Sequence, residues 1–310
     1  MLPRLPIAVL IAAVLAFAGD AAGQGSVTPI PNDVQAATQA LNDAQKKSVA
    51  DYVDAQARAF AGADPAQAVE IRNAMCKLLK GTPMRDPCRR EVGGQVVRAF
   101  RPFAKGTDPL RATNTFIIAR HAPCTETAGF LLDNSDATVQ SDVLLRVAAS
   151  AQLPQALRDG QFAGPQAESN AKQIAAAMRV EKDWVVASHL AEALVEALRS
   201  KGLTAASADL IATTLSDSIN DLAKRTLDGD QPDLVFALQR ALLAVRNRTS
   251  EIAPSARAKL LNGTIGSINR LVAMKGKAPA AFVNNERTGA FDSVTNTSEV
   301  LLQVQQTLRK

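Results

Sequence analysis

The Asp-Pro dipeptide recurs at a constant spacing in the first part of the chain. Each copy follows the last by 22 residues, at Asp64-Pro65, Asp86-Pro87 and Asp108-Pro109. An Asp side chain at the N-cap accepts hydrogen bonds from free backbone N–H groups, and Pro at the first helical position loses no hydrogen bond there. The spacing therefore predicts three helices that begin at equal intervals.

The segments after these starts each have the length of one helix. The first two, residues 65–81 and 87–106, end in Lys-Gly, where the cation stabilises the negative end of the helix dipole and Gly stops the helix. Helices of this length joined by short turns pack as antiparallel neighbours. Two steps then form one hairpin of about 44 residues, within the period of HEAT and armadillo repeats.

The pattern continues beyond residue 120 at looser intervals. Further helix starts are expected near Asp136, Gly164-Pro165, Asp183, Thr204, Gln231-Pro232, Ala253-Pro254 and Ala278-Pro279. In its period and helix starts the chain resembles a HEAT-like α-solenoid from Asp64 to Ala149, and by general pattern after that. The resemblance implies an all-α array of helical hairpins over residues 33–275 and a C-terminal segment, 276–310, with a capping helix. An irregular α-helical bundle is the alternative architecture.

Composition also favours closely packed helices. Ala, the best helix former, is the commonest residue, and only 4% of the residues are aromatic. Apolar residues at three- and four-residue spacings predict one long helix over residues 33–61. The only short β-branched runs, residues 115–119 and 183–188, lie within segments that also fit helices.

The first residues have the order of a secretory signal peptide. Arg4 precedes an apolar run over residues 5–18, and small residues then suit cleavage after Ala18 or near Gly23. The run is shorter than the roughly 20 residues that span a bilayer, and no later segment is apolar for long enough. We predict a signal peptide over 1–24, a lead-in over 25–32, and a periplasmic or secreted mature chain without a membrane span.

The charge pattern does not indicate a nucleic-acid partner. The net charge is +5 and the pI is about 9.2, but Lys and Arg are interleaved with Asp and Glu along the chain. Nucleic-acid-binding proteins concentrate basic residues in one stripe, and those that bind single strands add stacking aromatic residues. A solvated helix surface accounts for this pattern.

The stretch TFIIARHA contains the first of the two histidines of the chain. Arg120-His121-Ala122 after TFIIA is similar to the Arg-His motif of the histidine phosphatase family, and Ser188-His189 is similar to the second histidine of that family. The resemblance implies an α/β phosphohydrolase in which His121 is phosphorylated while Arg120 and His189 assist. The alternative is a helix C-terminus whose Arg and His face the negative end of the helix dipole.

Three cysteines follow the predicted signal peptide, in a compartment where disulfides persist. If the helices alternate in direction, Cys76, Cys88 and Cys124 lie at one edge of the array. We expect a disulfide between Cys76 and Cys88, with Cys88 and Cys124 as the alternative pair. His121 falls on the same edge, so a zinc site of Cys76, Cys88, His121 and Cys124 is a further alternative.

No other motif points to a cofactor. The sequence has no Cys-x-x-Cys-His, no glycine-rich phosphate loop and no His-Glu-x-x-His. We therefore expect a cofactor-free binding or scaffold protein that recognises another protein or a cell-envelope component and catalyses no reaction. The alternative, a histidine-phosphatase-like enzyme, predicts a parallel sheet with both histidines in one pocket, whereas the array predicts them on separate helices.

Overall fold

All regular structure in the described part of the chain is helical. The computed structural model describes residues 27–81, 84–106, 108–159, 164–200, 202–228, 231–282 and 284–308, and none of these lies in a β-strand. The predicted all-α class is confirmed. The α/β fold implied by the resemblance to histidine phosphatases is not the fold of these residues, because the two β-branched runs lie in helices.

The helices follow one another with short connections. In chain order they are α1 (Asn32–Gln35), α2 (Asp43–Gly62), α3 (Pro65–Lys80), α4 (Asp86–Phe100), α5 (Pro109–Ala119), α6 (Thr125–Asp133), α7 (Val143–Ser150), α8 (Leu153–Asp159), α9 (Gly164–Val180), α10 (Trp184–Ala197), α11 (Ala205–Leu227), α12 (Leu234–Arg248), α13 (Pro254–Ala273) and α14 (Asn285–Leu308). Two short 3-10 helices continue α4 and α12, namely η2 (Arg101–Lys105) and η3 (Thr249–Glu251).

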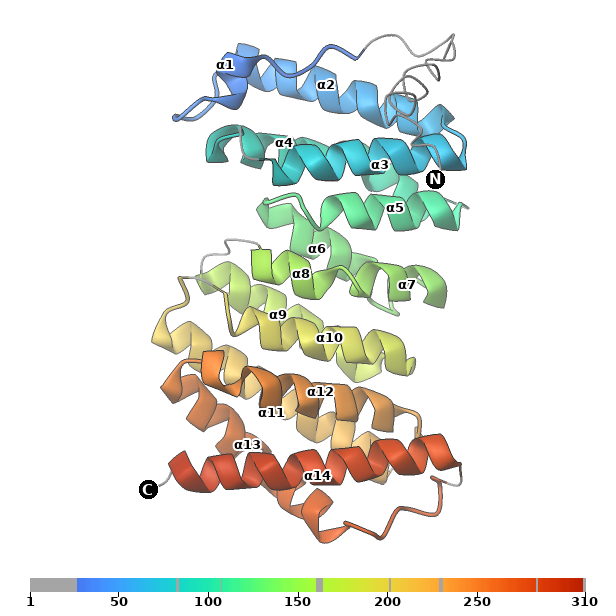
Figure 1. Ribbon diagram of the computed structural model, residues 1–310, viewed down its shortest axis with the longest axis vertical. Coiled ribbons are helices and arrows are strands. Elements are labelled where there is room, and N and C mark those ends of the chain that lie inside the picture. Colours follow the sequence, from blue (N-terminus) through green and yellow to red (C-terminus); the bar gives the residue numbers. More distant parts are fainter. Residues whose placement is uncertain are drawn as a thin grey trace, which may run out of the picture.

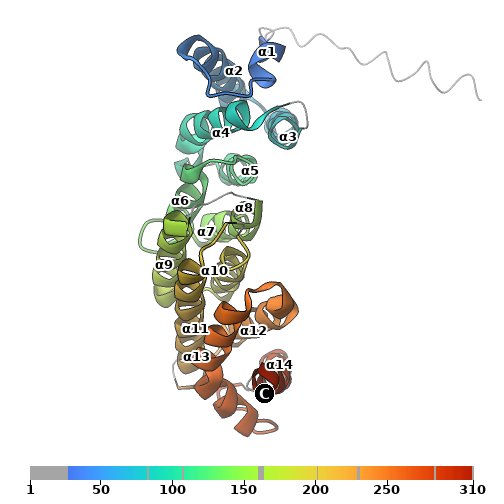
Figure 2. The same cartoon turned by 90° about the vertical axis from the view of Figure 1, so that its left-hand side faces the viewer.

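These helices are stacked in two layers, which Figure 2 shows side by side. In the first layer α2, α4, α6, α9, α11 and α13 each pack on the next. In the second layer the order is α3, α5, α7 with α8, α10, α12 and α14. Neighbouring helices of the chain also pack as pairs across the layers, for example α9 on α10 and α13 on α14. One cluster of buried apolar side chains extends from Ile30 to Leu301.

Local capping chemistry fixes several of the predicted helix starts. The Asp64 carboxylate accepts from the Gln67 N–H while the Gln67 side chain accepts from the Asp64 N–H, which forms a capping box at α3. Asp108 accepts from two N–H groups of α5, and Asp183 caps α10 in the same way. The Thr204 hydroxyl caps α11 by accepting from the Ser207 N–H. At α4 the N-cap is Arg85, so Asp86-Pro87 lies inside the first turn and no side chain caps the helix.

Other predicted starts are displaced. The carboxylate of Asp136 accepts from the Thr138 N–H in a turn, and the next helix begins only after Asp142, whose carboxylate caps α7. The last helix begins at Asn285 rather than near Ala278. The long helix predicted over 33–61 is also interrupted, because α1 ends at Gln35 and α2 begins anew from a capping box.

That interruption has a local cause. Asn42 accepts from the Gln45 N–H at 2.9 Å, and the Gln45 side chain accepts from the Asn42 N–H at 3.1 Å. This reciprocal pair stabilises a fresh helix start, so residues 36–42 remain as a loop between α1 and α2. The loop becomes one wall of the cavity described below.

The direction of the helices places several ends together. Because α3, α4, α5 and α6 alternate in direction, the starts of α4 and α6 lie at the same edge of the stack as the ends of α3 and α5, on the left in Figure 1. α14 packs on α12 and α13 at the far end of the stack. Within the described ranges no helix has both the length and the apolar character needed to cross a bilayer. The predicted signal peptide, 1–24, lies outside these ranges.

Candidate functional site

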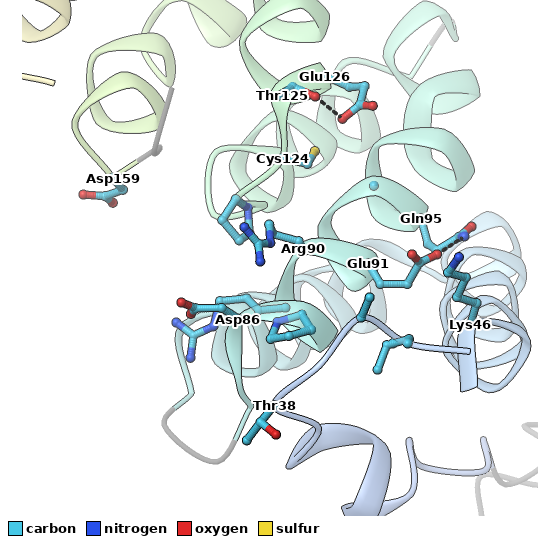
Figure 3. Close-up of a pocket in the computed structure, with 16 residues that line it drawn as sticks. Thr38, Lys46, Asp86, Arg90, Glu91, Gln95, Cys124, Thr125, Glu126 and Asp159 are labelled. Atoms are coloured by element: carbon cyan, nitrogen blue, oxygen red, sulfur yellow. Dashed lines mark hydrogen bonds between the residues drawn. The ribbon is translucent and has the colours of Figure 1, made fainter. Parts of the chain in front are cut away.

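A cavity of about 750 Å³ opens at the edge where α4 and α6 begin (Figure 3). This volume is within the range of small-molecule and cofactor sites. We call it the edge pocket. Its walls come from the α1–α2 loop, the first turn of α2, residues 86–95 of α4, the turn before α6 with the start of α6, and the end of α8. The lining residues are Thr38, Ala40, Leu41, Lys46, Asp86, Pro87, Arg89, Arg90, Glu91, Gly94, Gln95, Pro123, Cys124, Thr125, Glu126 and Asp159.

Two consecutive glycines of α4 shape the edge pocket. A Cβ on Gly93 would lie 3.2 Å from both the Cδ and the backbone N of Pro123, so glycine lets α4 approach the turn before α6 closely. A Cβ on Gly94 would meet no atom within 4 Å, and Gly94 faces the open space of the pocket. Gly93 thus allows α4 to pack against the turn before α6, whereas Gly94 leaves part of the α4 wall of the pocket without a side chain.

The lining is rich in charged groups that have no ionic partner among the described residues. Seven line the pocket: Lys46, Asp86, Arg89, Arg90, Glu91, Glu126 and Asp159. None of them forms a salt bridge with another described residue, although ion pairs are frequent elsewhere in the stack. With four carboxylates and three cations, the lining is close to neutral but strongly polar.

Three of the carboxylates accept hydrogen bonds from uncharged neighbours. Glu91 accepts from the Gln95 amide at 2.7 Å, Glu126 accepts from the Thr125 hydroxyl at 3.0 Å, and Asp159 accepts from the Gln155 amide at 3.1 Å. The backbone N–H of Glu126 itself, at the start of α6, lowers the pKa of the Glu126 carboxyl, and the Thr125 hydroxyl adds to this shift. Glu126 is therefore ionised at neutral pH.

Arg89 and Gln95 have buried atoms that lack a partner. The Arg89 guanidinium donates to the carbonyls of Gly81 at 2.6 Å and Met84 at 2.9 Å, which ties the end of α3 to α4. Its Nε–H makes no hydrogen bond with the described residues, and the same holds for Oε1 of Gln95. Both atoms are shielded from solvent, so neither is presented to the open space of the pocket. Lys46 and Arg90, both exposed, also make no side-chain hydrogen bond within the described ranges.

Cys124 places a thiol in the edge pocket. Its Sγ lies 3.1 Å from Oγ1 of Thr127, whose hydroxyl donates to the Ala122 carbonyl at 2.7 Å. The thiol is therefore the donor to Thr127. Burial raises the pKa of Cys124, so the thiol is protonated at neutral pH and is not an activated nucleophile.

The disulfide expected between Cys76 and Cys88 is not formed, and neither is the alternative pair of Cys88 and Cys124, because all three thiols are free. The cysteines lie near one edge of the stack, but their side chains have different neighbours. Cys76 Sγ lies 3.8 Å from the Ile117 carbonyl, and Cys124 bonds to Thr127. Cys88 is buried in α4, where burial and the Glu91 carboxylate raise the pKa of its thiol to about 11.

The alternative zinc site is also not assembled. Across the described ranges no group of three or more His, Cys, Asp and Glu side chains could hold a metal ion. Cys76, Cys88, His121 and Cys124 therefore do not converge. His121 instead accepts a hydrogen bond from its chain neighbour, Arg120.

Arg120 and His121 lie where α5 ends. Arg120 Nε donates to Nε2 of His121 at 2.9 Å, and Nη1 of Arg120 donates to Oε1 of Gln152 at 2.8 Å. Burial, and secondarily the Arg120 and Lys80 charges, lower the pKa of His121 to about 4. His121 is therefore neutral at physiological pH, as its acceptor role requires.

His189 lies on a separate helix, α10. Its Nδ1 is 3.1 Å from Oγ of Ser150, a fully buried hydroxyl, and burial followed by the Arg240 charge lowers the pKa of His189. Ser150 and Gln152 both belong to the junction of α7 and α8, which thus contacts His189 on one side and Arg120 on the other. These hydrogen bonds of Arg120 and His189 connect α5, α7 and α10. Neither histidine lines the edge pocket.

Among the residues of the edge pocket, sequence reasoning identified only Cys124 as a candidate site residue, and it named Asp86 and Pro87 only as a helix start. The missed signal was the Gly93-Gly94 pair inside a predicted helix, since each helical Gly costs about 1 kcal/mol relative to Ala. Comparison with known proteins adds no assignment: no protein-family model matches the chain, and a search of curated proteins found no match. The candidate site is thus defined by its geometry alone.

Proposed function

We propose that the chain is an exported, HEAT-like helical-repeat protein that binds part of another protein or of an envelope component in the edge pocket, without catalysing a reaction. One observation carries this proposal. Seven charged side chains line a cavity of about 750 Å³, and none of them is paired with another described residue. A folded chain gains no stability from this arrangement, whereas a partner with complementary charges would.

The architecture supports a repeat protein rather than an irregular bundle. Each helix packs on the next helix of its own layer and on its neighbour in the chain, and the same scheme extends from α2 to α14. Stacked helical pairs of this type present long surfaces and interact mainly with adjacent pairs. Such a stack can bind a partner along an edge without a deep active site.

The chemistry of the nucleophilic side chains supports binding over catalysis. The Cys124 thiol is protonated at neutral pH and donates to Thr127. The Ser150 hydroxyl next to His189 is fully buried, so no substrate reaches it. His121 is neutral and accepts from Arg120, which leaves this pair without a free basic nitrogen directed at a ligand.

Site-specific photo-cross-linking in the expressing cell tests the proposal. A photo-reactive amino acid at Thr38 or Thr125, both exposed in the lining, should yield a discrete cross-linked species. The same group at Gln303, exposed on α14 at the far end, serves as the control. Cross-linking from the two pocket positions and not from Gln303 supports the proposal, whereas none from the pocket or an equal yield from Gln303 contradicts it.

A further inference from the structure

We propose that the occupant of the edge pocket is a polypeptide segment that carries both basic and acidic side chains, with the basic ones in slight excess. This inference rests on the proposed binding function and specifies the class of partner. It combines the balance of charges in the lining, the lack of aromatic side chains among the described lining residues and the open wall at Gly94.

The balance of charges selects against polyanions. Four carboxylates line the pocket beside three cations, and one of these cations, Arg89, already donates to two backbone carbonyls. Lys46 and Arg90 therefore remain as the cations free to meet a partner. A nucleic acid or a cluster of lipid phosphates would place its charges among the carboxylates, and like charges across an interface are unfavourable. A segment with one or two more cations than anions matches the lining.

The uncharged part of the lining also fits a polypeptide. None of the described lining residues is aromatic, so the pocket offers no ring on which a nucleobase can stack. Leu41, Pro87 and Pro123 supply apolar surface between the charged groups. The aliphatic stems of lysine or arginine side chains pack on such surface while their charged ends reach a carboxylate.

Gly94 keeps a wall of the pocket accessible. It lies within α4, where glycine lowers helix stability, and no atom lies within 4 Å of the place its Cβ would take. Glycine allows another main chain to approach a helix closely, because no side chain separates the two backbones. A side chain introduced there would enter the pocket without striking the protein itself.

Peptide pools measure the partner class directly. Four pools of fluorescein-labelled heptapeptides are titrated with the purified protein, and binding is followed by fluorescence polarisation. The Lys-Asp pool contains Lys, Asp, Gly and Ser, the Lys pool contains Lys, Gly and Ser, and the Asp pool contains Asp, Gly and Ser. The uncharged pool contains only Gly and Ser. The Lys-Asp pool should bind at least tenfold more tightly than the Asp pool and the uncharged pool, and several-fold more tightly than the Lys pool.

Two glycine variants show whether this binding uses the edge pocket. Gly94→Met fills the pocket and should weaken binding of the Lys-Asp pool at least tenfold. Gly266→Met is the matched control, because Gly266 is a helical glycine of α13 with equally open space beside it, and it should bind like the wild type. Both variants replace an interior helical Gly with a better helix former, so a difference in folding does not explain a difference in binding.

Each remaining outcome is decisive. Tighter binding of the Asp pool, equal binding of the Lys pool, no binding of the Lys-Asp pool, or binding that Gly94→Met leaves intact overturns the assignment of a mixed-charge polypeptide segment to the edge pocket. If cross-linking from Thr38 and Thr125 persists in that case, the proposed function stands and only the class of partner is wrong. If that cross-linking is also absent, the proposed function fails with it.

Discussion

Two charge-rich regions of the stack differ in whether their charged side chains form salt bridges. At the junction of α8, α10 and α12, Glu196 is 1% exposed and contacts three arginines: Arg158 at 3.2 Å, Arg199 at 2.5 Å and Arg248 at 3.7 Å. In the edge pocket, seven charged side chains form no salt bridge with any described residue. A carboxylate that folding removes from water needs ionic partners, because an unpaired buried charge is strongly destabilising.

This difference separates a structural cluster from a candidate binding site. Arg199 bonds to both Glu196 and Glu251, so the cluster joins α10 to η3 at the end of α12. The edge pocket instead remains open to water, which solvates its charges until a partner replaces the water. The same types of side chain therefore stabilise the fold at the first place and remain available at the second.

Removal of Glu196 should produce the largest effect on stability. Glu196→Gln leaves the three arginines without their shared carboxylate, and we expect the free energy of unfolding to fall by about 3 kcal/mol. This loss is at the low end of the range for fully buried ion pairs because Arg158 and Arg248 are partly exposed. Urea denaturation measures this loss. Glu192→Gln, on the same helix and less buried, is the control. A loss no larger than that of the control would contradict the structural role of the cluster.

The adjacent glycines of α4 should respond in opposite directions to the same substitution. Gly93→Ala places a Cβ 3.2 Å from Pro123, and we expect the free energy of unfolding to fall by about 1–2 kcal/mol through overpacking. Gly94→Ala meets open space and should raise it by about 0.5–1 kcal/mol through helix propensity. Thermal unfolding of both variants tests this, and an equal response would mean that the two positions have similar surroundings.

The pKa of His121 predicts a loss of stability on acidification. Its pKa in the folded protein, about 4, lies below the ordinary value of 6.5, so the unfolded chain binds a proton first as the pH falls. The contribution of neutral His121 is complete above pH 6.5 and declines as the pH falls toward 4. Denaturation at a series of pH values should give a shallower decline for His121→Gln than for the wild type. Parallel curves would contradict the shift.

Charges of the edge pocket should matter least for stability. Lys46→Glu and Arg90→Glu remove no salt bridge within the described ranges, and we expect each to change the free energy of unfolding by less than about 0.5 kcal/mol. Arg248→Glu in the Glu196 cluster is the comparison and should destabilise clearly. If the pocket variants destabilise as much, their charges support the fold and are not reserved for a partner.

Local chemistry made much of the fold predictable. The all-α class and the starts of α3, α5, α10 and α11 follow from caps such as Asp64 and Asp183, whose hydrogen bonds involve residues close in sequence. The break after α1 was also readable, since Asn42 and Gln45 have the spacing of a capping box. The helix start predicted near Asp136 was wrong because an Asp carboxylate accepts hydrogen bonds equally well in a turn and at a helix start.

The candidate site was beyond prediction for a different reason. The edge pocket combines segments of α2, α4, α6 and α8 that are far apart in sequence, and only the stacking of helices brings them together. The cysteines show the same limit. Their spacing placed them near one edge, but the direction of each thiol depends on packing, as the contact of Cys76 with the Ile117 carbonyl shows.

The most direct test of the comparison is photo-cross-linking from Thr125 in the expressing cell, carried out with the wild type and with Lys46→Glu, Arg90→Glu double-variant protein. If the pocket charges are reserved for a partner, the wild type forms a discrete cross-linked species and the double variant, though equally stable, loses most of it. An unchanged yield in the stable double variant would contradict the account, because the unpaired charges would then have no part in binding.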